Sequence, residues 1–505
     1  MLKTTRKFLL NDAWAISNLA WFGLLYLSLP VAIFLLAWEV TLVGLPLVTL
    51  LVTFLVVTHP RPLKLKFVSS ANIVTAICAA IWVYSTGIFG HGFGMADDWV
   101  RMRFDLLSTL TQHSWPIRHV FEQQGDVYFL RHYLAYYLPG PLVGKFFGGS
   151  LQVTQIATGV WTFLGVWLVL LMVINTLSNL GKRRFIAIPI FVLFSGLDVI
   201  GSRLKGFLAL RPSSIANGGH IEWWAREFQF SSNTTLIHWV PQHALSGWLA
   251  TLILCHLAKS RAFIPVAIVL PAITLLWSPF STAGIIIVIC LLAASRTSVD
   301  NLKIYWKQYL PLLFGAITLF AVLALFLFSG TSDIQRYFIF SDSAYKYMGY
   351  TTRNGFILTL GNLGLFLLLE VGFYLGLCFY IASKRRVLIS LGVALSAVLL
   401  LKVGLYNDFA MRASIPLLCI LSLEVSRAVL SRHRATSGQF ARVALTGLLM
   451  IGSVTAIFEF VTRARTQPAG LIAPCIDSGC LSDLTSDSLR SYNWTRARPI
   501  LIREP

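Results

Sequence analysis

SLQVTQIATGVWTFLGVWLVLLMVINTL, residues 150–177, contains no Asp, Glu, Lys or Arg along its whole length. A helix needs about 20 mostly apolar residues to cross a hydrocarbon core about 30 Å thick, so this stretch predicts a transmembrane helix. Twelve further segments meet the same test or come near it: 13–38, 40–58, 68–90, 185–201, 243–258, 262–280, 281–295, 308–329, 356–382, 387–405, 414–430 and 441–462. In lipid, backbone N–H and C=O groups must be satisfied within each segment. The sequence therefore predicts an all-α, polytopic integral membrane protein with about 13 transmembrane helices, in a range of about 11 to 14.

The composition agrees with this class. The 505 residues have a mean hydropathy of +0.72, and only 12% of them are charged, whereas a soluble protein carries about 25% charged residues. The net charge of +20 comes largely from short basic loops, which fix orientation and favour anionic lipid headgroups. Since no soluble basic domain is present, we expect membrane lipids and no nucleic acid as partners.

The basic clusters predict which loops face the cytoplasm. They are Lys3/Arg6/Lys7, Arg61/Lys64/Lys66, Lys182/Arg183/Arg184, Lys259/Arg261, Arg296/Lys303/Lys307, Lys384/Arg385/Arg386 and Arg427/Arg432/Arg434. All of them fall on one side if residues 131–148 do not cross, and basic loops stay inside. We therefore expect a plasma (inner) membrane protein with a cytoplasmic N-terminus and an extracytoplasmic C-terminal tail. The outer side then receives residues 91–149, 202–242, 330–355, 406–412 and 463–505.

This layout divides the chain into four parts. They are N-terminal transmembrane helices at 1–90, a long outer loop at 91–149, a transmembrane core at 150–462 and a short outer tail at 463–505. The start MLKTTRKFLLNDAW predicts a basic flank of the first span rather than a cleavable signal peptide. Cys475 and Cys480 in the tail would form a disulfide in an oxidising compartment or remain free thiols.

The loop 91–149 opens with HGFGMADDWVRMRFD, in which Asp97 and Asp98 are followed by Arg101 and Arg103. The pattern of residues 98–124 predicts one or two interfacial helices. RHYLAYYLPGPLVGKFFGG, residues 131–149, is too short to span, and its Pro-Gly-Pro would interrupt a helix. We expect that segment to be re-entrant or to lie on the membrane surface.

The adjacent carboxylates Asp97 and Asp98 are candidate catalytic residues. Two neighbouring acids repel, and partial desolvation raises the pKa of at least one of them towards a range useful for proton transfer. Together they are also a ligand set for a hard divalent cation, which is the one cofactor candidate. The structural alternative is that one of them caps the helix that follows.

The other outer loops carry further candidates for substrate binding. Loop 202–242 contains His220 and Glu222, with Glu227, His238 and His243 as further acid, base or metal candidates; the alternative is an aromatic-rich interfacial loop. Loop 330–355 contains Lys346 and Arg353, which suit a phosphate headgroup or alternatively snorkel to the interface. The turn YNDFAMRASIP contains Asp408 and Arg412, and we expect Arg412 to pair with Asp408 or with a lipid phosphate.

Several function classes lack their sequence signatures here. The chain has no phosphate-binding loop of Walker type, no GxSxG and no HExxH. It also shows no internal repeat and no matched pair of broken helices, which disfavours a secondary transporter.

Asp97-Asp98 lies in a long outer loop after an early span and is followed by interfacial helices and an aromatic Tyr/Pro segment. This arrangement resembles the GT-C superfamily, polytopic glycosyltransferases that use polyprenyl-phosphate-linked sugars. The resemblance covers residues 68–462 by layout and only 91–149 by motif. The chain departs from the family in two ways. Its acidic loop is preceded by two additional spans, whereas in many members the loop follows the first span, and its C-terminal tail is short.

The resemblance implies a mechanism at the outer face. Asp97 or Asp98 would act as general base on a hydroxyl of a glycan, lipid or protein acceptor, which attacks the anomeric carbon with inversion. Arg412, Arg353 or Lys346 would neutralise the departing polyprenyl phosphate. No nucleotide sugar would be needed.

Two alternatives remain open. A lipid-linked polysaccharide polymerase or ligase would depend on Arg226, His220 and Arg353 rather than on the acidic pair. A non-enzymatic transporter or flippase would need ionisable groups inside the spans. Those at mid-span are few: Asp198, Glu370, Lys402 and Glu424.

Overall fold

The structure, a computed structural model, describes most of the chain. The described residues are 16–38, 43–60, 69–97, 103–121, 126–207, 220–225, 228–295, 300–328, 336–348, 350–381, 385–404, 407–431, 436–472 and 494–496. The candidate residues outside them are Asp98, Arg101, Arg226, Glu227, Cys475 and Cys480, so the predictions made for these six residues stay predictions.

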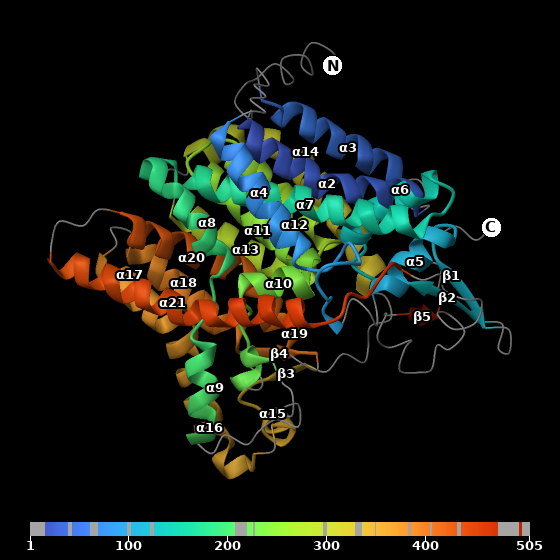
Figure 1. Cartoon of the computed structure of the whole chain (residues 1–505). Helices are drawn as coiled ribbons and strands as arrows, with labels where there is room; N and C mark the ends of the chain where they lie inside the picture. Colours follow the sequence, from blue (N-terminus) through green and yellow to red (C-terminus); the bar gives the residue numbers. More distant parts are fainter. Residues whose placement is uncertain are drawn as a thin grey trace.

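Helices make up most of the described chain (Figure 1). The α-helices are α2 (Asn18–Ala37), α3 (Gly44–Thr58), α4 (Ser70–Tyr84), α5 (Phe104–Gln112), α6 (Pro139–Phe146), α7 (Leu151–Thr176), α8 (Ala187–Val192), α9 (Asp198–Phe207), α10 (Asn233–Trp239), α11 (Pro241–Leu257), α12 (Phe263–Leu275), α13 (Pro279–Ala294), α14 (Asp300–Phe328), α15 (Asp342–Tyr347), α16 (Thr352–Leu367), α17 (Phe373–Ile381), α18 (Arg385–Val398), α19 (Asp408–Ala413), α20 (Ile415–Leu430) and α21 (Thr436–Arg465). Shorter turns are η3 (Ala135–Tyr137), η4 (Ser178–Ile186), η5 (Ile221–Ala225) and the π-helical η6 (Leu368–Gly372).

Each apolar segment predicted from sequence overlaps at least one of these helices. Within the described residues, five helices are long and apolar enough to cross a membrane: Asn18–Ala37, Leu151–Thr176, Tyr309–Phe328, Thr352–Ile381 and Gly438–Arg465. Such helices suggest a membrane-embedded protein. The number of crossings and their sidedness stay predictions.

The segment 185–201 is not one continuous helix. Helix α8 ends at Val192 and α9 begins at Asp198. Between them, the carbonyl of Phe194 accepts a hydrogen bond from the backbone N–H of Asn233 at 3.1 Å. A Cβ on Gly196 would lie 1.7 Å from Oε2 of Glu370, so the chain passes this carboxyl group only because position 196 has no side chain. The break in the helix is therefore stabilised by contacts with α10 and η6.

Two small antiparallel sheets modify the all-α prediction. One has the strand order β1 (Arg118–Phe121), β2 (Asp126–Leu130), β5 (Trp494–Arg496). The other pairs β3 (Arg336–Phe338) with β4 (Leu401–Val403), and Tyr337 lies opposite Lys402. The predicted span 387–405 therefore ends as helix α18 at Val398 and continues as a strand.

The loop at 91–149 differs in part from its prediction. Among the described residues of the segment 98–124, α5 is helical, as expected for one or two helices, but the β1–β2 hairpin follows it. Helix α5 is not a surface helix either, since Leu106, Leu107 and Leu110 are buried. The hairpin segments RHVF and DVYFL are rich in the β-branched and aromatic residues that favour strands over helices.

Residues 134–141 are buried rather than spread on a surface, whereas Phe146 and Phe147 at the end of the segment are exposed. Tyr136, Tyr137 and Leu138 are almost completely inaccessible, and α6 begins at Pro139, where proline is tolerated because the first turn needs no backbone donor. A Cβ on Gly140 would lie 2.1 Å from Oγ1 of Thr158. The glycine thus lets α6 approach the backbone of α7 closely.

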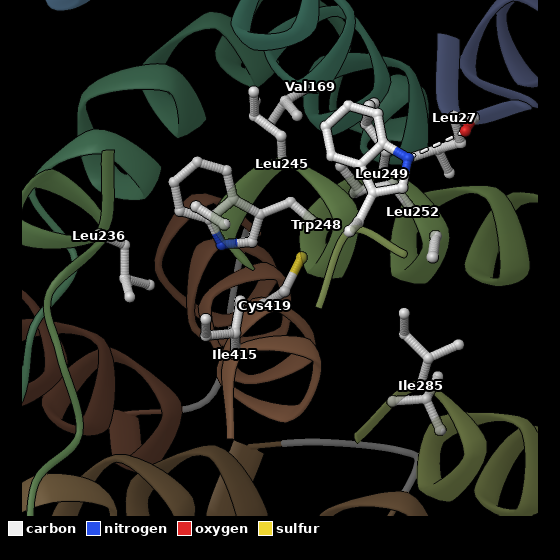
Figure 2. Packing of buried hydrophobic residues seen from close by; sticks show 14 of the residues in the cluster. Leu27, Val169, Leu236, Leu245, Trp248, Leu249, Leu252, Ile285, Ile415 and Cys419 are labelled. Atoms are coloured by element: carbon white, nitrogen blue, oxygen red, sulfur yellow. Dashed lines mark hydrogen bonds between the residues drawn. The ribbon is translucent and has the colours of Figure 1, made fainter. Parts of the chain in front are cut away.

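Helix α11 forms the centre of the packed core. Nearly all of its residues are buried, including Trp248, which stacks on Trp82 of α4 at a centroid distance of 5.8 Å. Figure 2 shows Trp248 beside Cys419 and Ile415 of α20. The indole N–H of Trp277 donates to the carbonyl of Leu27 at 2.9 Å, which ties the end of α12 to α2. Because α11 is surrounded on all sides, residues at its N-terminus can meet several other elements.

Candidate functional site

The junction between α10 and α11 contributes one residue to each of two clusters of polar and ionisable side chains. Ser232 caps α10, accepting from the backbone N–H of Thr235 at 3.0 Å. Val240, with φ −141° and ψ 54°, interrupts the helix, and α11 restarts at Pro241. Trp239 on one side of this break contacts a carboxylate cluster, and His243 on the other side contacts a cationic cluster.

The carboxylate cluster consists of His220, Glu222, Trp239, Glu459 and Arg463. Nε2 of His220 lies 2.8 Å from Oε2 of Glu459. The indole N–H of Trp239 donates to Oε1 of Glu459 at 2.9 Å, and Nε of Arg463 pairs with the same oxygen at 3.0 Å. The side chains of Glu222 and Glu459 are fully buried, and a buried charge needs such partners to persist.

Glu222 is held by a second set of hydrogen bonds. The backbone N–H of Ser232 donates to Oε1 of Glu222 at 2.9 Å, and Nε2 of Gln229 donates to Oε2 at 3.1 Å. Nδ1 of His220 lies 3.9 Å from Oε2 of Glu222. These bonds hold Gln229 and Ser232, which precede α10, against Glu222.

Two further buried acids lie beyond Glu222. Oδ2 of Asp198 accepts from the hydroxyl of Ser195 at 2.8 Å and from that of Thr455 at 3.2 Å. Oε1 of Glu370 accepts from the indole N–H of Trp224 at 3.1 Å. Glu370 lies in the π-helical turn η6, a type of distortion that often occurs at functional sites.

His220 is positioned to carry a positive charge. Burial alone would lower its pKa, but Glu222 and then Glu459 outweigh this effect and raise the pKa of His220 above its ordinary value. Protonated His220 offsets part of the negative charge of the surrounding carboxylates, and these carboxylates favour that form.

Arg463 also anchors the segment that carries Asp97. Its guanidinium donates to the carbonyl of Met95 at 2.5 Å, and its own carbonyl accepts from the backbone N–H of Gly94 at 2.8 Å. Asp97, two residues after Met95, is exposed. Asp97, the candidate base, therefore comes directly after a backbone segment that is hydrogen-bonded to Arg463 of the carboxylate cluster.

The cationic cluster consists of Arg103, His132, His243 and Arg412. These residues come from the start of α5, the segment after β2, the first turn of α11, and α19. The rings of His243 and Tyr133 lie 4.9 Å apart, and those of Tyr133 and His132 lie 3.8 Å apart. Arg103 and Arg412 are the charged groups that act on both imidazoles. Four segments distant in sequence therefore bring cations and imidazoles together.

The imidazoles of this cluster are not satisfied by protein groups. Among the described residues, Nδ1 of His132 and both ring nitrogens of His243 have no hydrogen-bond partner, and neither does Oε1 of Gln242. Buried polar atoms are normally hydrogen-bonded, so unpaired ones point to water or a ligand. Such atoms beside two guanidinium groups suit an anion.

Arg412 is oriented by its own helix. Its Nη1 forms an ion pair with Oδ1 of Asp408 at 2.9 Å, which confirms one of the two partners expected for Arg412. The hydroxyl of Ser281 donates to the carbonyls of both Arg412 and His243 at 3.2 Å. This bridge holds α19 and the N-terminal turn of α11 side by side.

Two of the remaining predicted residues, Lys346 and Arg353, are not part of either cluster. Lys346 on α15 and Arg353 on α16 are exposed, and in the described part of the structure neither forms an ion pair. No group of three or more metal-ligating side chains is assembled among the described residues. A divalent cation at Asp97/Asp98 stays a prediction, because Asp98 is not described.

The sequence analysis did not identify three ionisable members of the two clusters: His132, Glu459 and Arg463. A signal for Glu459 was present, because an acid inside the apolar segment 441–462 is costly unless it has a function or a partner. His132 was hidden in an aromatic segment, where nothing local distinguishes it from an interfacial side chain.

Comparison of the chain with protein-family models, with curated proteins and with solved structures finds no significant match.

We expect His132 to make the protein acid-sensitive. Burial, Arg103 and Arg412 lower the pKa of His132 to about 3, whereas an unfolded histidine titrates near 6.5. Between these pH values the unfolded chain binds a proton that the folded chain excludes, so stability decreases as pH falls through this range. Between pH 7 and pH 5, His132 should account for a loss of about 2 kcal/mol.

Thermal unfolding of the wild type and His132→Asn at both pH values tests this expectation. The midpoint of the variant should fall less on acidification than that of the wild type. Equal decreases in the two proteins would contradict the assignment.

Proposed function

We propose that this protein transfers a glycosyl group from a polyprenyl-phosphate carrier to an acceptor hydroxyl, with inversion, at the α10–α11 junction. The acceptor would be a glycan, lipid or protein of the cell envelope. The proposal places the reaction at the outer face of a plasma (inner) membrane, in agreement with the sidedness expected from the basic loops.

The cationic cluster is the observation that carries the proposal. Arg103 is buried and Arg412 is only partly exposed, and both act on the imidazoles of His132 and His243. Guanidinium groups bind phosphate oxygens bidentately and remain charged in poorly solvated sites. A carrier phosphate in this cluster would contact both guanidinium groups and give the imidazole nitrogens that lack a described partner a hydrogen bond.

Asp97 would act on the acceptor. The acceptor oxygen forms a bond to the anomeric carbon while the bond from that carbon to the phosphate oxygen breaks. The electron pair leaves with the phosphate, and the hydroxyl proton passes to the Asp97 carboxylate. Arg103 and Arg412 would stabilise the charge that develops on the leaving phosphate.

The polymerase or ligase alternative is favoured by one observation. His132 and His243 lie in the cationic cluster itself and have ring nitrogens without partners among the described residues. One of these imidazoles could accept the hydroxyl proton instead of Asp97. The two functions share phosphate binding and differ in the identity of the base.

Glycosyl transfer by the Asp97→Asn variant distinguishes them. In vesicles loaded with a radiolabelled polyprenyl-phosphate sugar, we expect the variant to lose about 10²–10⁴-fold in rate, the usual contribution of a general base. Asp342→Asn is the matched control, because Asp342 is also an exposed acid in the first turn of a helix. The control should keep full activity.

Two results would contradict parts of the proposal. Full activity of Asp97→Asn and of Asp98→Asn, with loss in His132→Asn, would transfer the role of base to the cationic cluster. Absence of sugar transfer by the wild type from any polyprenyl-phosphate sugar would reject the proposed function.

A further inference from the structure

A groove lies between α2, α4 and α7. Helix α7 packs against both α2 and α4. The groove has a volume of about 520 Å³ and is mainly apolar. Its inner end is formed by Tyr26 and Trp161, whose rings stack at 4.0 Å with an interplanar angle of 13°. The hydroxyl of Tyr26 donates to the carbonyl of Trp161 at 3.0 Å, which holds this pair in place.

The polar groups of the groove gather at one end. Asn18 is the first residue of α2, Asn72 lies in the first turn of α4, Asn175 lies in the last turn of α7, and Arg184 lies in η4. In the described residues, Nε of Arg184 has no hydrogen-bond partner. Two helix N-termini and a guanidinium group therefore meet where the apolar part ends, and all of them favour an anion.

The dimensions of the groove match one lipid chain. Along α2, Asn18 and Leu29 are separated by 11 residues, which is about 16 Å at 1.5 Å per residue. One leaflet of a hydrocarbon core about 30 Å thick is about 15 Å deep. Leu29 and Leu164 are 44% and 36% exposed, so the groove is open at its side, as lateral access from a bilayer requires.

We propose that this groove binds a phospholipid with an anionic headgroup. One acyl chain lies along Phe22, Leu168 and Trp161, and the headgroup phosphate contacts Arg184 and the N-terminal ends of α2 and α4. The neighbouring Lys182 and Arg183 belong to a basic cluster expected at the cytoplasmic surface. The site thus lies at the opposite ends of α4 and α7 from Ser85, which contacts His238, and from Gln155, whose amide donates to the carbonyl of Gly470.

Native mass spectrometry of the purified full chain tests the proposal. The protein is delipidated in detergent and then mixed with palmitoyl-oleoyl phosphatidylglycerol or with the corresponding phosphatidylcholine. We expect the wild type to retain phosphatidylglycerol preferentially. Arg184→Gln should weaken its retention about five-fold, the factor expected for one basic residue at an anionic headgroup. Lys182→Gln is the matched control, because it removes the same charge two residues away and does not line the groove.

A second variant tests the apolar part independently of charge. Leu168→Trp should fill the groove and abolish retention of both lipids, whereas Leu36→Trp, at a position of α2 that is 60% exposed and outside the groove, should not. Gel filtration and the thermal midpoint show whether each variant is folded. Unchanged retention in a folded Leu168→Trp protein would overturn the proposal.

Two further outcomes would also overturn it. Equal retention of both lipids, unaffected by Arg184→Gln, would show unselective filling by hydrocarbon. Lipid retention only after removal of residues 1–15 would assign the groove to the protein's own N-terminal segment.

Discussion

Arg412→Ala and Arg103→Ala are each expected to lower the rate of glycosyl transfer by about 10²–10³-fold, the usual cost of removing one donor that stabilises developing charge. Each guanidinium would contact the carrier phosphate, whose negative charge increases as the bond to the sugar breaks. Because charge is stabilised more in the transition state than in the ground state, kcat should fall more than KM rises. Initial rates at several concentrations of the polyprenyl-phosphate sugar measure this difference.

Arg386→Ala is the matched control for this prediction. Arg386 is an exposed arginine on α18, outside both clusters, and its replacement should leave kcat unchanged. Arg412→Lys should recover only part of the activity, since an ammonium group cannot bind two phosphate oxygens in the planar geometry of a guanidinium. Full activity of Arg412→Ala and Arg103→Ala in folded protein would remove the cationic cluster from the mechanism.

Glu459→Ala is expected to destabilise the protein by about 3–5 kcal/mol, the cost of breaking a buried ion pair by removing one partner. Glu459 contacts His220, Trp239 and Arg463 at once. Its loss would leave the guanidinium of Arg463, the imidazole of His220 and an indole N–H buried without their acceptor. A large decrease of the thermal midpoint in detergent would show the effect.

Glu424→Ala provides the comparison. Glu424 also lies in an apolar helix and also pairs with an arginine of its own helix, Arg427, but both side chains are partly exposed. An exposed pair contributes about 0–1 kcal/mol. If the two variants lost similar stability, burial of the carboxylate cluster would not be what makes Glu459 important.

The helices of the core were predictable because their signal is local. Residues 150–177 contain α7, and 414–430 contain α20, each within a few residues of the predicted bounds. A long apolar stretch favours a helix whatever surrounds it, since the backbone must bond within itself. The predictions failed where the outcome depends on distant contacts, as in 185–201, where η6 and α10 stabilise a break.

The candidate site was predictable only in part. Residue type and position in outer loops pointed to His220, Glu222, Asp408 and Arg412. Sequence could not show that His220 and Glu222 meet Glu459, a residue more than 230 positions away along the chain. The sequence also could not show that Arg412 belongs to a cluster and that Lys346 and Arg353 do not, because all three are basic residues in short polar segments.

The sequence alone determined that this protein is built from apolar helices, because hydrophobicity and helix length are properties of each segment by itself. Only the tertiary structure decided that Arg103, His132, His243 and Arg412 form one cluster and that Trp239 and Arg463 converge on Glu459. Those contacts join elements far apart in the chain. They depend on how α11 packs among its neighbours, and no local pattern encodes the faces that four separate segments turn towards one another.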